Sequence, residues 1–444
     1  MLDPIYVRLL AALLALGAIW TLTHHSGVNS QAGLDIAGAH PFLREDSEKI
    51  KHLSGNSEMS KSSEGYDYGN WPPEVLLGEV HRAAENLDRA IALPFDQNKA
   101  QVARGIAVYF PASEPQQEKE LRGLLLSIAH MRTFQQSTVK TDLVVFSPPR
   151  GYAFLESVGC SFERRGSFAD SERCVIIEHI PLSERPGVDD PLLSYKRYLD
   201  SVLMVAEYKH YSDYDYLMKS DMDTFVTPAF ADLRLQPGKV IAVGHGGYGH
   251  RHANARLSFI MKETFALSDS GMFNIGTTWF GSPAVLVAAC QVSVASMRWL
   301  DRMEFTEYER THPTTDTWPL WYWPVLTMYG GHISINQIGS DKVMLQQENV
   351  IEMDFGSDYA TDLRPSIKHI HCWHTANFFS KFAFASGQYD AMDLTEHAEM
   401  KSAPSYSAVI ALSAVRLSIA EFKAIISDPV RVKNGEWKRL KVDR

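Results

Sequence analysis

Hydrophobic positions along this chain gather in short unbroken runs, with amphipathic stretches between them. Such runs occupy residues 105–110, 142–146, 174–180, 214–218 and 240–243. Runs of this length without alternation are typical of strands that are covered on both faces of a sheet. Helical spacing predicts helices between them, over residues 118–134 and about 194–211. This order predicts an α/β fold with a mostly parallel sheet and helices on both faces.

The most hydrophobic segment lies at the N-terminus. Residues 9–22 carry no charge, and only Arg8 interrupts the apolar stretch back to Ile5. A membrane span needs about 20 such residues, and the basic group before the segment predicts a cytosolic N-terminus. We therefore predict an uncleaved signal-anchor, with a cleaved signal peptide and a buried helix as alternatives. The first two readings send the rest of the chain into the secretory pathway, and we expect a single-pass type II protein of the Golgi or ER membrane with a luminal main domain.

A polar stretch rich in Ser, Gly and charged residues follows, up to about Gly69, and predicts a stem. After Trp71 the spacing of apolar residues predicts a helix that lies on the main domain. The predicted segments are an anchor over 1–25, a stem with this helix over 26–100, a main domain over 101–400 and a helical tail over 401–444.

Composition narrows the class of protein. The 444 residues include 45% hydrophobic and 11% aromatic residues, which excludes a largely disordered chain. A formal charge of −10 argues against a protein that grips nucleic acid by neutralising phosphates. The mean hydropathy of −0.18 excludes a polytopic membrane protein but allows one span.

Four cysteines do not make a disulfide scaffold. Cys160 and Cys174 flank a polar loop, so an oxidising lumen would allow a disulfide between them.

A pair of aspartates follows the apolar run at 214–218. Asp221 and Asp223 are two residues apart, so both carboxylates face the same side of an extended chain. Mn²⁺ and Mg²⁺ prefer such oxygen ligands and leave positions open for substrate phosphates. The alternative is a charged turn that caps the next element.

The stretch YDYLMKSDMDTFV, residues 214–226, resembles the D-x-D element of GT-A glycosyltransferases, which use nucleotide-diphosphate sugars. Residues 271–283 (GMFNIGTTWFGSP) are similar to the strand and loop that lie beside donor sugar and acceptor in that fold, and a helix is predicted after them. The resemblance implies a GT-A, Rossmann-like mixed sheet and a layout closer to retaining than to inverting enzymes. It also implies substrate contacts by Asp221, Asn274, Gly276 and Trp279.

A histidine cluster, HIHCWH, provides two further candidate metal ligands, His374 and, as second choice, His371. In enzymes of the resembling family a late histidine ligates the metal, and a lysine shortly after it contacts the diphosphate. Lys381 is similar to that lysine. The alternatives are a structural Zn²⁺ site that includes Cys372, or buried histidines with hydrogen bonds in the core.

Three more residues are candidates for the reaction site. Asp316 resembles the acidic residue that begins the helix after the acceptor-side strand, although Asp before a Trp-Pro run is also a good helix N-cap. Asp269, just before the glycine-containing loop, is the second candidate for a catalytic carboxylate. His245 begins a glycine-rich loop and is expected to contact donor or acceptor.

Together these features predict a metal-dependent glycosyltransferase that uses Mn²⁺ or Mg²⁺. It would move a hexose-type sugar from a nucleotide-diphosphate donor to a glycan, glycoprotein or glycolipid acceptor, with retention. A metal-dependent hydrolase and a non-catalytic sugar-binding derivative of the same fold are the alternatives.

Overall fold

The computed structural model describes residues 71–195, 198–312, 321–345, 350–359, 361–372 and 379–441. The chain divides into two compact units, Met1–Tyr66 and Asp67–Arg444, and every described residue belongs to the second. The predicted signal-anchor and most of the predicted stem lie outside the described residues. Within the described part, one helix, α8 (Pro283–Met303), is long and apolar enough to cross a membrane, and it is mostly buried inside the protein.

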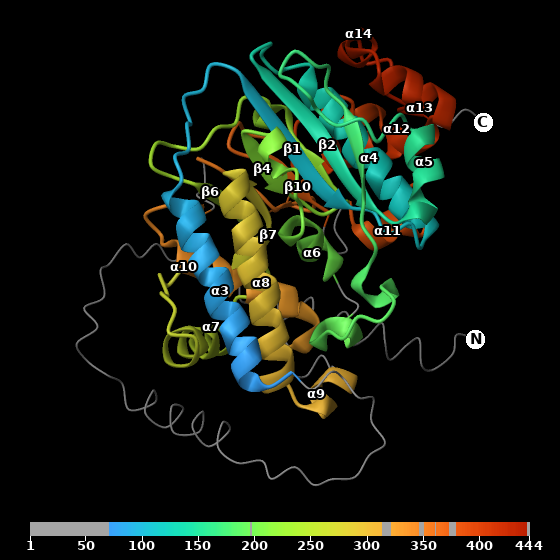
Figure 1. Ribbon diagram of the computed structural model, residues 1–444. Helices are drawn as coiled ribbons and strands as arrows, with labels where there is room; N and C mark the ends of the chain where they lie inside the picture. The colour runs from blue at the N-terminus through green and yellow to red at the C-terminus, as the bar shows by residue number, and fades with distance from the viewer. Residues whose placement is uncertain are drawn as a thin grey trace, which may run out of the picture. The chain divides into compact units, whose positions relative to one another are not determined.

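A seven-stranded mixed sheet forms the centre of this unit (Figure 1). Its strands, in the order in which they lie side by side, are β3 (Cys174–Glu178), β2 (Val139–Ser147), β1 (Val102–Tyr109), β4 (Tyr216–Lys219), β7 (Ile275–Gly281), β6 (Ile241–His245) and β8 (Val343–Leu345). Strand β7 runs antiparallel to both of its neighbours, and the other pairs are parallel. The prediction of a mixed, mostly parallel α/β sheet is confirmed.

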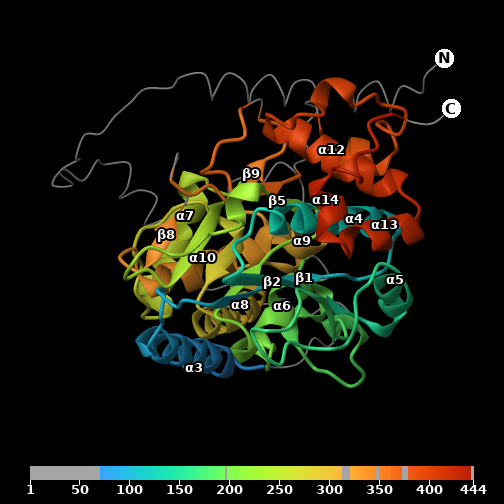
Figure 2. The same cartoon turned by 90° about the horizontal axis from the view of Figure 1, so that it is seen from above.

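Helices cover both faces of the sheet (Figure 2). One layer contains α3 (Pro73–Ala92), α6 (Asp200–Ala206), α8 and α10 (Leu326–Ile338), and the other contains α4 (Pro115–Arg132), α12 (Ala403–Arg416), α13 (Ile419–Ile426) and α14 (Pro429–Lys433). The shorter helices are α5 (Tyr152–Ser157), α7 (Arg251–Phe259), α9 (Glu307–Thr311) and α11 (Lys381–Ala385). Each layer closes its own hydrophobic core against the sheet.

The helix predicted after Trp71 is present as α3. Its buried residues, Leu76, Val80, Ala83, Ala84, Leu87 and Ala90, form one stripe, and α3 packs along α8. On the other face α12 packs on α4. The segment boundaries predicted after residues 25, 100 and 400 stay predictions, but α3 and α12 share one compact unit with the sheet.

Two predicted helices differ from the structure. The helix expected over about 194–211 is reduced to α6, because Asp190 caps a separate short turn, Pro191–Ser194, before it. The tail helix breaks between α12 and α13. There Ser418 and Glu421 form a capping box, which satisfies the first amides of a new helix and so starts α13.

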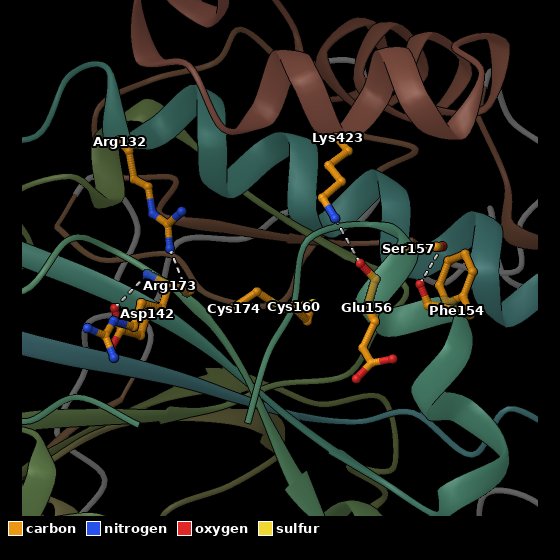
Figure 3. The surroundings of a disulfide bond; sticks show 9 residues. All are labelled: Arg132, Asp142, Phe154, Glu156, Ser157, Cys160, Arg173, Cys174 and Lys423. Carbon is orange, nitrogen blue, oxygen red and sulfur yellow. Dashed lines mark hydrogen bonds between the residues drawn. A yellow bond between two sulfur atoms is a disulfide. The ribbon is translucent and has the colours of Figure 1, made fainter. Parts of the chain in front are cut away.

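Cys160 and Cys174 form a disulfide that joins the segment after α5 to β3 (Figure 3). Cys290 and Cys372 are free and buried.

A second, three-stranded sheet lies beyond the end of β4. It contains β5 (Thr224–Val226), β10 (His369–His371) and β9 (Phe355–Gly356) in that order. Strand β10 is antiparallel to β5 and parallel to β9. Because β5 follows β4 after only four residues, this small sheet is joined closely to the carboxyl end of a central strand.

Candidate metal centre

Asp221 and Asp223 lie in the turn between β4 and β5. The Thr224 hydroxyl donates a hydrogen bond to the Asp221 carbonyl oxygen at 2.7 Å and fixes the turn. The sequence predicted an extended strand through both aspartates, and the turn corrects this detail. Their carboxylates nevertheless converge, because ligand atoms of Asp221, Asp223 and His371 all lie within 4.8 Å of one another.

The pairing of β10 with β5 brings His371 to this turn. His371 stands opposite Thr224 in the antiparallel register. One residue further, the Cys372 amide donates to the Asp223 carbonyl oxygen at 2.9 Å and extends the ladder. As a result, His371 Nε2 is 3.6 Å from Asp223 Oδ2.

Lys381, the first residue of α11, forms an ion pair with the same carboxylate. Its Nζ donates to Asp223 Oδ2 at 2.6 Å. Burial would raise the pKa of Asp223, but His371 and Lys381 outweigh it and hold this pKa well below its usual range. Burial would likewise lower the pKa of His371, yet Asp223 and Asp354 raise it well above its ordinary value. Asp223, His371 and Lys381 therefore stabilise one another as charged groups.

Strand β7 supports the other aspartate. The Thr277 hydroxyl donates to Asp221 Oδ2 at 3.1 Å, and Lys219 Nζ donates to the Thr277 carbonyl oxygen at 2.9 Å. Thr277 thus orients Asp221. In the sequence, the only indication of this role was that Thr277 lies within the motif of residues 271–283.

Asp354, the residue before β9, is a buried carboxylate that sequence reasoning missed. Its Oδ1 is 3.5 Å from His371 Nδ1, and Thr278 donates to it from both its amide and its hydroxyl. Burial would raise the pKa of Asp354, but His371 and His369 help to lower it to about 2. The signal in the sequence was weak, because Ile351, Met353 and Phe355 alternate with Glu352 and Asp354. That alternation is typical of a strand with its polar face in water.

Glu120 on α4 is a second missed carboxylate. It lines a small, partly open pocket together with Lys119, Asp223 and Lys381. Burial, with the nearby charge of Asp223, raises the pKa of Glu120 to about 7. No spacing in the sequence links α4 to the aspartate pair, because the contact is long-range.

His369 serves the core. Ser220 Oγ lies 2.9 Å from His369 Nε2, and the Asp354 amide donates to Nδ1 at 3.3 Å. Burial lowers the pKa of His369 to about 4, so it is a neutral hydrogen-bonding group.

Several predicted substrate contacts lie on β6 and β7. Asn274, with φ of 57°, ties the strands together: its Nδ2 is 2.9 Å from His245 Nε2, and its Oδ1 accepts from the Gly249 amide at 2.9 Å. His245 is exposed at the end of β6. Gly276 provides space for Asp354, since a Cβ there would lie 2.3 Å from Asp354 Oδ2.

Two further predicted site residues, Trp279 and Asp269, make contacts that support the structure. Trp279 is 2% exposed, and a Cβ on Gly331 of α10 would lie 2.9 Å from its ring. It therefore packs in the core and cannot stack on a sugar. Asp269 accepts hydrogen bonds from Ser258 and Gly271 and pairs with Lys262. These contacts hold the loop before β7, and the assignment of Asp269 as a catalytic carboxylate stays a prediction. Asp316 and His374 lie outside the described residues.

The donor set fits a hard or borderline divalent cation. Two carboxylates and one imidazole are ligand types that Mn²⁺ accepts, and oxygen-rich sites with open positions also suit Mg²⁺. A structural Zn²⁺ site with Cys372 is not favoured. The ligand group that the described residues bring together contains Asp221, Asp223 and His371, and the Cys372 sulfur is not part of it.

A family model described as "Domain of unknown function (DUF7164)" matches residues 98–438. The chain belongs to this family. No curated protein matches the sequence of this chain. Among solved structures, mouse xyloside xylosyltransferase 1 in its apo form is similar at 14% identity and a TM-score of 0.29, over 61% of this chain and 97% of that one. The apo WbbM bifunctional glycosyltransferase is similar at 11% identity and a TM-score of 0.33, over 63% and 46% of the two chains.

Proposed function

We propose that this protein is a metal-dependent glycosyltransferase of the GT-A type. It moves a hexose-type sugar from a nucleotide-diphosphate donor to a glycan, glycoprotein or glycolipid acceptor, with retention. One observation carries the proposal: Asp221, Asp223 and His371 converge beside Lys381 at the carboxyl end of β4. Open α/β sheets bind their ligands at the carboxyl ends of the strands.

The residues of the site have separate roles in this proposal. Asp221, Asp223 and His371 would hold Mn²⁺ or Mg²⁺, with His374 as a further candidate ligand. Such a cation, when bound, supplies positive charge where the departing nucleoside diphosphate develops negative charge. Lys381 adds a second point charge for the diphosphate. Thr277 keeps Asp221 turned toward the cation through its 3.1 Å hydrogen bond.

A retaining reaction places few demands on a protein base. In one retaining route a protein group lies on the β-face of the donor sugar, and in the other the leaving phosphate itself takes the proton of the acceptor hydroxyl. Asp316 remains our candidate for the carboxylate near the donor sugar, and Asn274, Gly276 and His245 for the surroundings of the sugar.

We also propose a luminal location, in the Golgi or ER, with one N-terminal membrane helix. The Cys160–Cys174 disulfide supports an oxidising compartment. Protease protection of the main domain in intact microsomes tests the topology, and digestion without detergent would contradict it.

The decisive experiment is a donor panel. Purified protein is incubated with UDP-, GDP- and CMP-sugars and Mn²⁺, and release of the nucleotide is measured for wild type and Asp223→Ala. The control is Asp341→Ala, which removes an exposed carboxylate whose side chain is 78% accessible. We expect release from one donor class, lost in Asp223→Ala and in EDTA but kept in Asp341→Ala. Absence of both turnover and nucleotide-diphosphate binding in wild type would overturn the proposal. Metal-dependent cleavage of phosphoesters without sugar transfer would favour a hydrolase.

A further inference from the structure

Asp354 is a buried carboxylate that lies between the large sheet and His371. It is 4% exposed, and both of its oxygens accept hydrogen bonds from one residue of the large sheet. The Thr278 amide donates to Oδ2 at 2.9 Å, and the Thr278 hydroxyl donates to Oδ1 at 2.5 Å. Placing a carboxylate in such a site costs free energy unless its charge and hydrogen bonds are satisfied.

The large sheet is shaped to receive this side chain. A Cβ on Gly244 would lie 2.2 Å from Asp354 Oδ2, and a Cβ on Gly276 would lie 2.3 Å from it. Asp354 itself has a φ of 56°, in the left-handed region that non-glycine residues rarely adopt. Two glycines leave space for the Asp354 carboxylate, and an uncommon backbone conformation directs it there. Its position is therefore closely defined by the surrounding structure.

His371 lies between this carboxylate and the candidate metal centre. Its Nδ1 is 3.5 Å from Asp354 Oδ1, and its Nε2 is 3.6 Å from Asp223 Oδ2. The ring thus presents one nitrogen to each carboxylate. An imidazole can ligate a cation only through a nitrogen without a proton, so cation binding would release one of the two protons of the charged His371 ring. Which nitrogen keeps the other proton then decides whether Nε2 is available.

We propose that Asp354 is a positioning residue that keeps the proton of His371 on Nδ1, so that the Nε2 lone pair faces the cation site of Asp221 and Asp223. The inference rests on the proposed function, because it requires a cation at that site. Metal-ligating histidines commonly donate their other N–H to a carboxylate, which fixes the ring and its tautomer.

The substitution Asp354→Asn tests this, because it replaces the hydrogen-bond acceptor that faces His371 Nδ1 with a donor. The Thr278 amide always donates, so the oxygen of the new amide must take the Oδ2 position. Its NH₂ group then takes the Oδ1 position and donates to His371 Nδ1, while the Thr278 hydroxyl can turn and accept. The proton of His371 moves to Nε2, where it blocks the cation. Asn tolerates the left-handed conformation, so the backbone is preserved.

Affinity for Mn²⁺ alone, measured by calorimetry without donor, gives the first readout. We expect Asp354→Asn to bind Mn²⁺ about 10- to 100-fold more weakly than wild type. The matched control is Asp301→Asn on α8, which removes another buried carboxylate whose Oδ1 accepts from Trp323 Nε1 at 2.6 Å. We expect unchanged Mn²⁺ affinity in this control. Equal affinity of Asp354→Asn and wild type, even with a lower Tm, would overturn the inference.

The ring proton of His371 gives a second readout, which is taken from the wild-type protein and does not depend on the Asp354→Asn variant. In wild type saturated with Mg²⁺, ¹H–¹⁵N NMR of labelled histidine, assigned with His371→Gln, should show the proton on Nδ1. A proton on Nε2 would overturn the inference. Failure of wild type to bind Mn²⁺ or Mg²⁺ at all would overturn the proposed metal-dependent function as well, whereas binding that is insensitive to Asp354 would overturn only the positioning role.

Discussion

Two regions of this protein bury carboxylates in opposite ways. In the first, which we call the β2–β3 corner, Asp142 faces Arg165 in a bidentate pair with distances of 2.8 and 2.5 Å. The Arg173 amide and the Tyr214 hydroxyl also donate to Asp142. The side chains of Asp142 and Arg165 are 0% and 2% exposed. The Cys160–Cys174 disulfide lies near Asp142 and Arg173 (Figure 3). Every charge in this corner has its partner.

The second region, the candidate metal centre, has an excess of negative charge. Asp221, Asp223 and Asp354 share the cations His371 and Lys381, and Glu120 adds a fourth carboxylate nearby. Like charges at such distances raise each other's energy unless a cation or a proton joins them. The difference separates a buried ion pair whose charges balance from a cluster in which carboxylates outnumber the cations His371 and Lys381.

The largest expected effect on stability is in the β2–β3 corner. Asp142→Asn leaves Arg165 buried without a counter-charge, so we expect the free energy of unfolding to fall by about 3–5 kcal/mol. Urea unfolding followed by circular dichroism measures it. The control is Asp213→Asn, because Asp213 pairs with Arg164 at 3.5 Å near the surface, where such a pair contributes less than about 1 kcal/mol. A loss for Asp142→Asn no greater than for the control would remove the contrast between the two regions.

The disulfide gives the next largest effect. Cys160→Ser with Cys174→Ser opens a loop with a sequence separation of 14, and we expect a loss of about 3 kcal/mol in unfolding free energy. Mn²⁺ affinity should stay unchanged, because the corner does not contact the metal centre. Cys290→Ala controls for loss of a buried cysteine that forms no bridge. A weaker affinity for Mn²⁺ in the double variant would show that the two regions are coupled.

The features that the sequence predicted are those that depend on local patterns. Apolar runs predicted the central strands and the mostly parallel sheet, because strands covered on both faces need unbroken hydrophobic sequence. Local spacing also found Asp221 and Asp223, and the histidine cluster provided His371. These patterns are local. They predict the site correctly where the residues involved are close in the chain or lie at the end of a strand.

The remaining site residues depend on contacts that are distant in the sequence. Asp354 reaches His371 only because β9 pairs with β10, and Glu120 reaches Asp223 only because α4 packs near β5. Trp279 shows the reverse case. Its place in a loop motif predicted a substrate contact, whereas the structure packs its side chain against α10 and buries it. Tertiary packing, which no local pattern encodes, decided all three.

A substitution of Lys381 tests whether the negative charge of the second region can bind a metal ion in place of the lysine. Its Nζ occupies Asp223 at 2.6 Å, in competition with a metal ion. Lys381→Met should therefore raise the affinity for Mn²⁺ alone by up to about tenfold, which corresponds to about 1.4 kcal/mol. It should also lower the affinity for nucleoside diphosphate in the presence of Mn²⁺, because a phosphate contact is lost. Calorimetry measures both, and Lys381→Arg, which keeps the charge, is the control. A change of both affinities in the same direction would refute the competition.

Glu120 gives the smallest and most specific test, through pH. Its folded-state pKa is raised to about 7, above the ordinary 4.5, so the unfolded state releases this proton more readily. Its contribution to stability is therefore fully present below about pH 4.5 and is lost as the pH rises through about 7, with a slope of at most about 1.4 kcal/mol per pH unit for one proton. Glu120→Gln should remove this loss, so the stability of the variant relative to wild type rises between these pH values. Urea midpoints from pH 4.5 to 8 measure the difference, with the exposed Glu118→Gln on the same helix as control. Parallel curves for wild type and Glu120→Gln would show that the pKa of Glu120 is not raised in the folded protein, so neither burial nor the charge of Asp223 favours its protonated form.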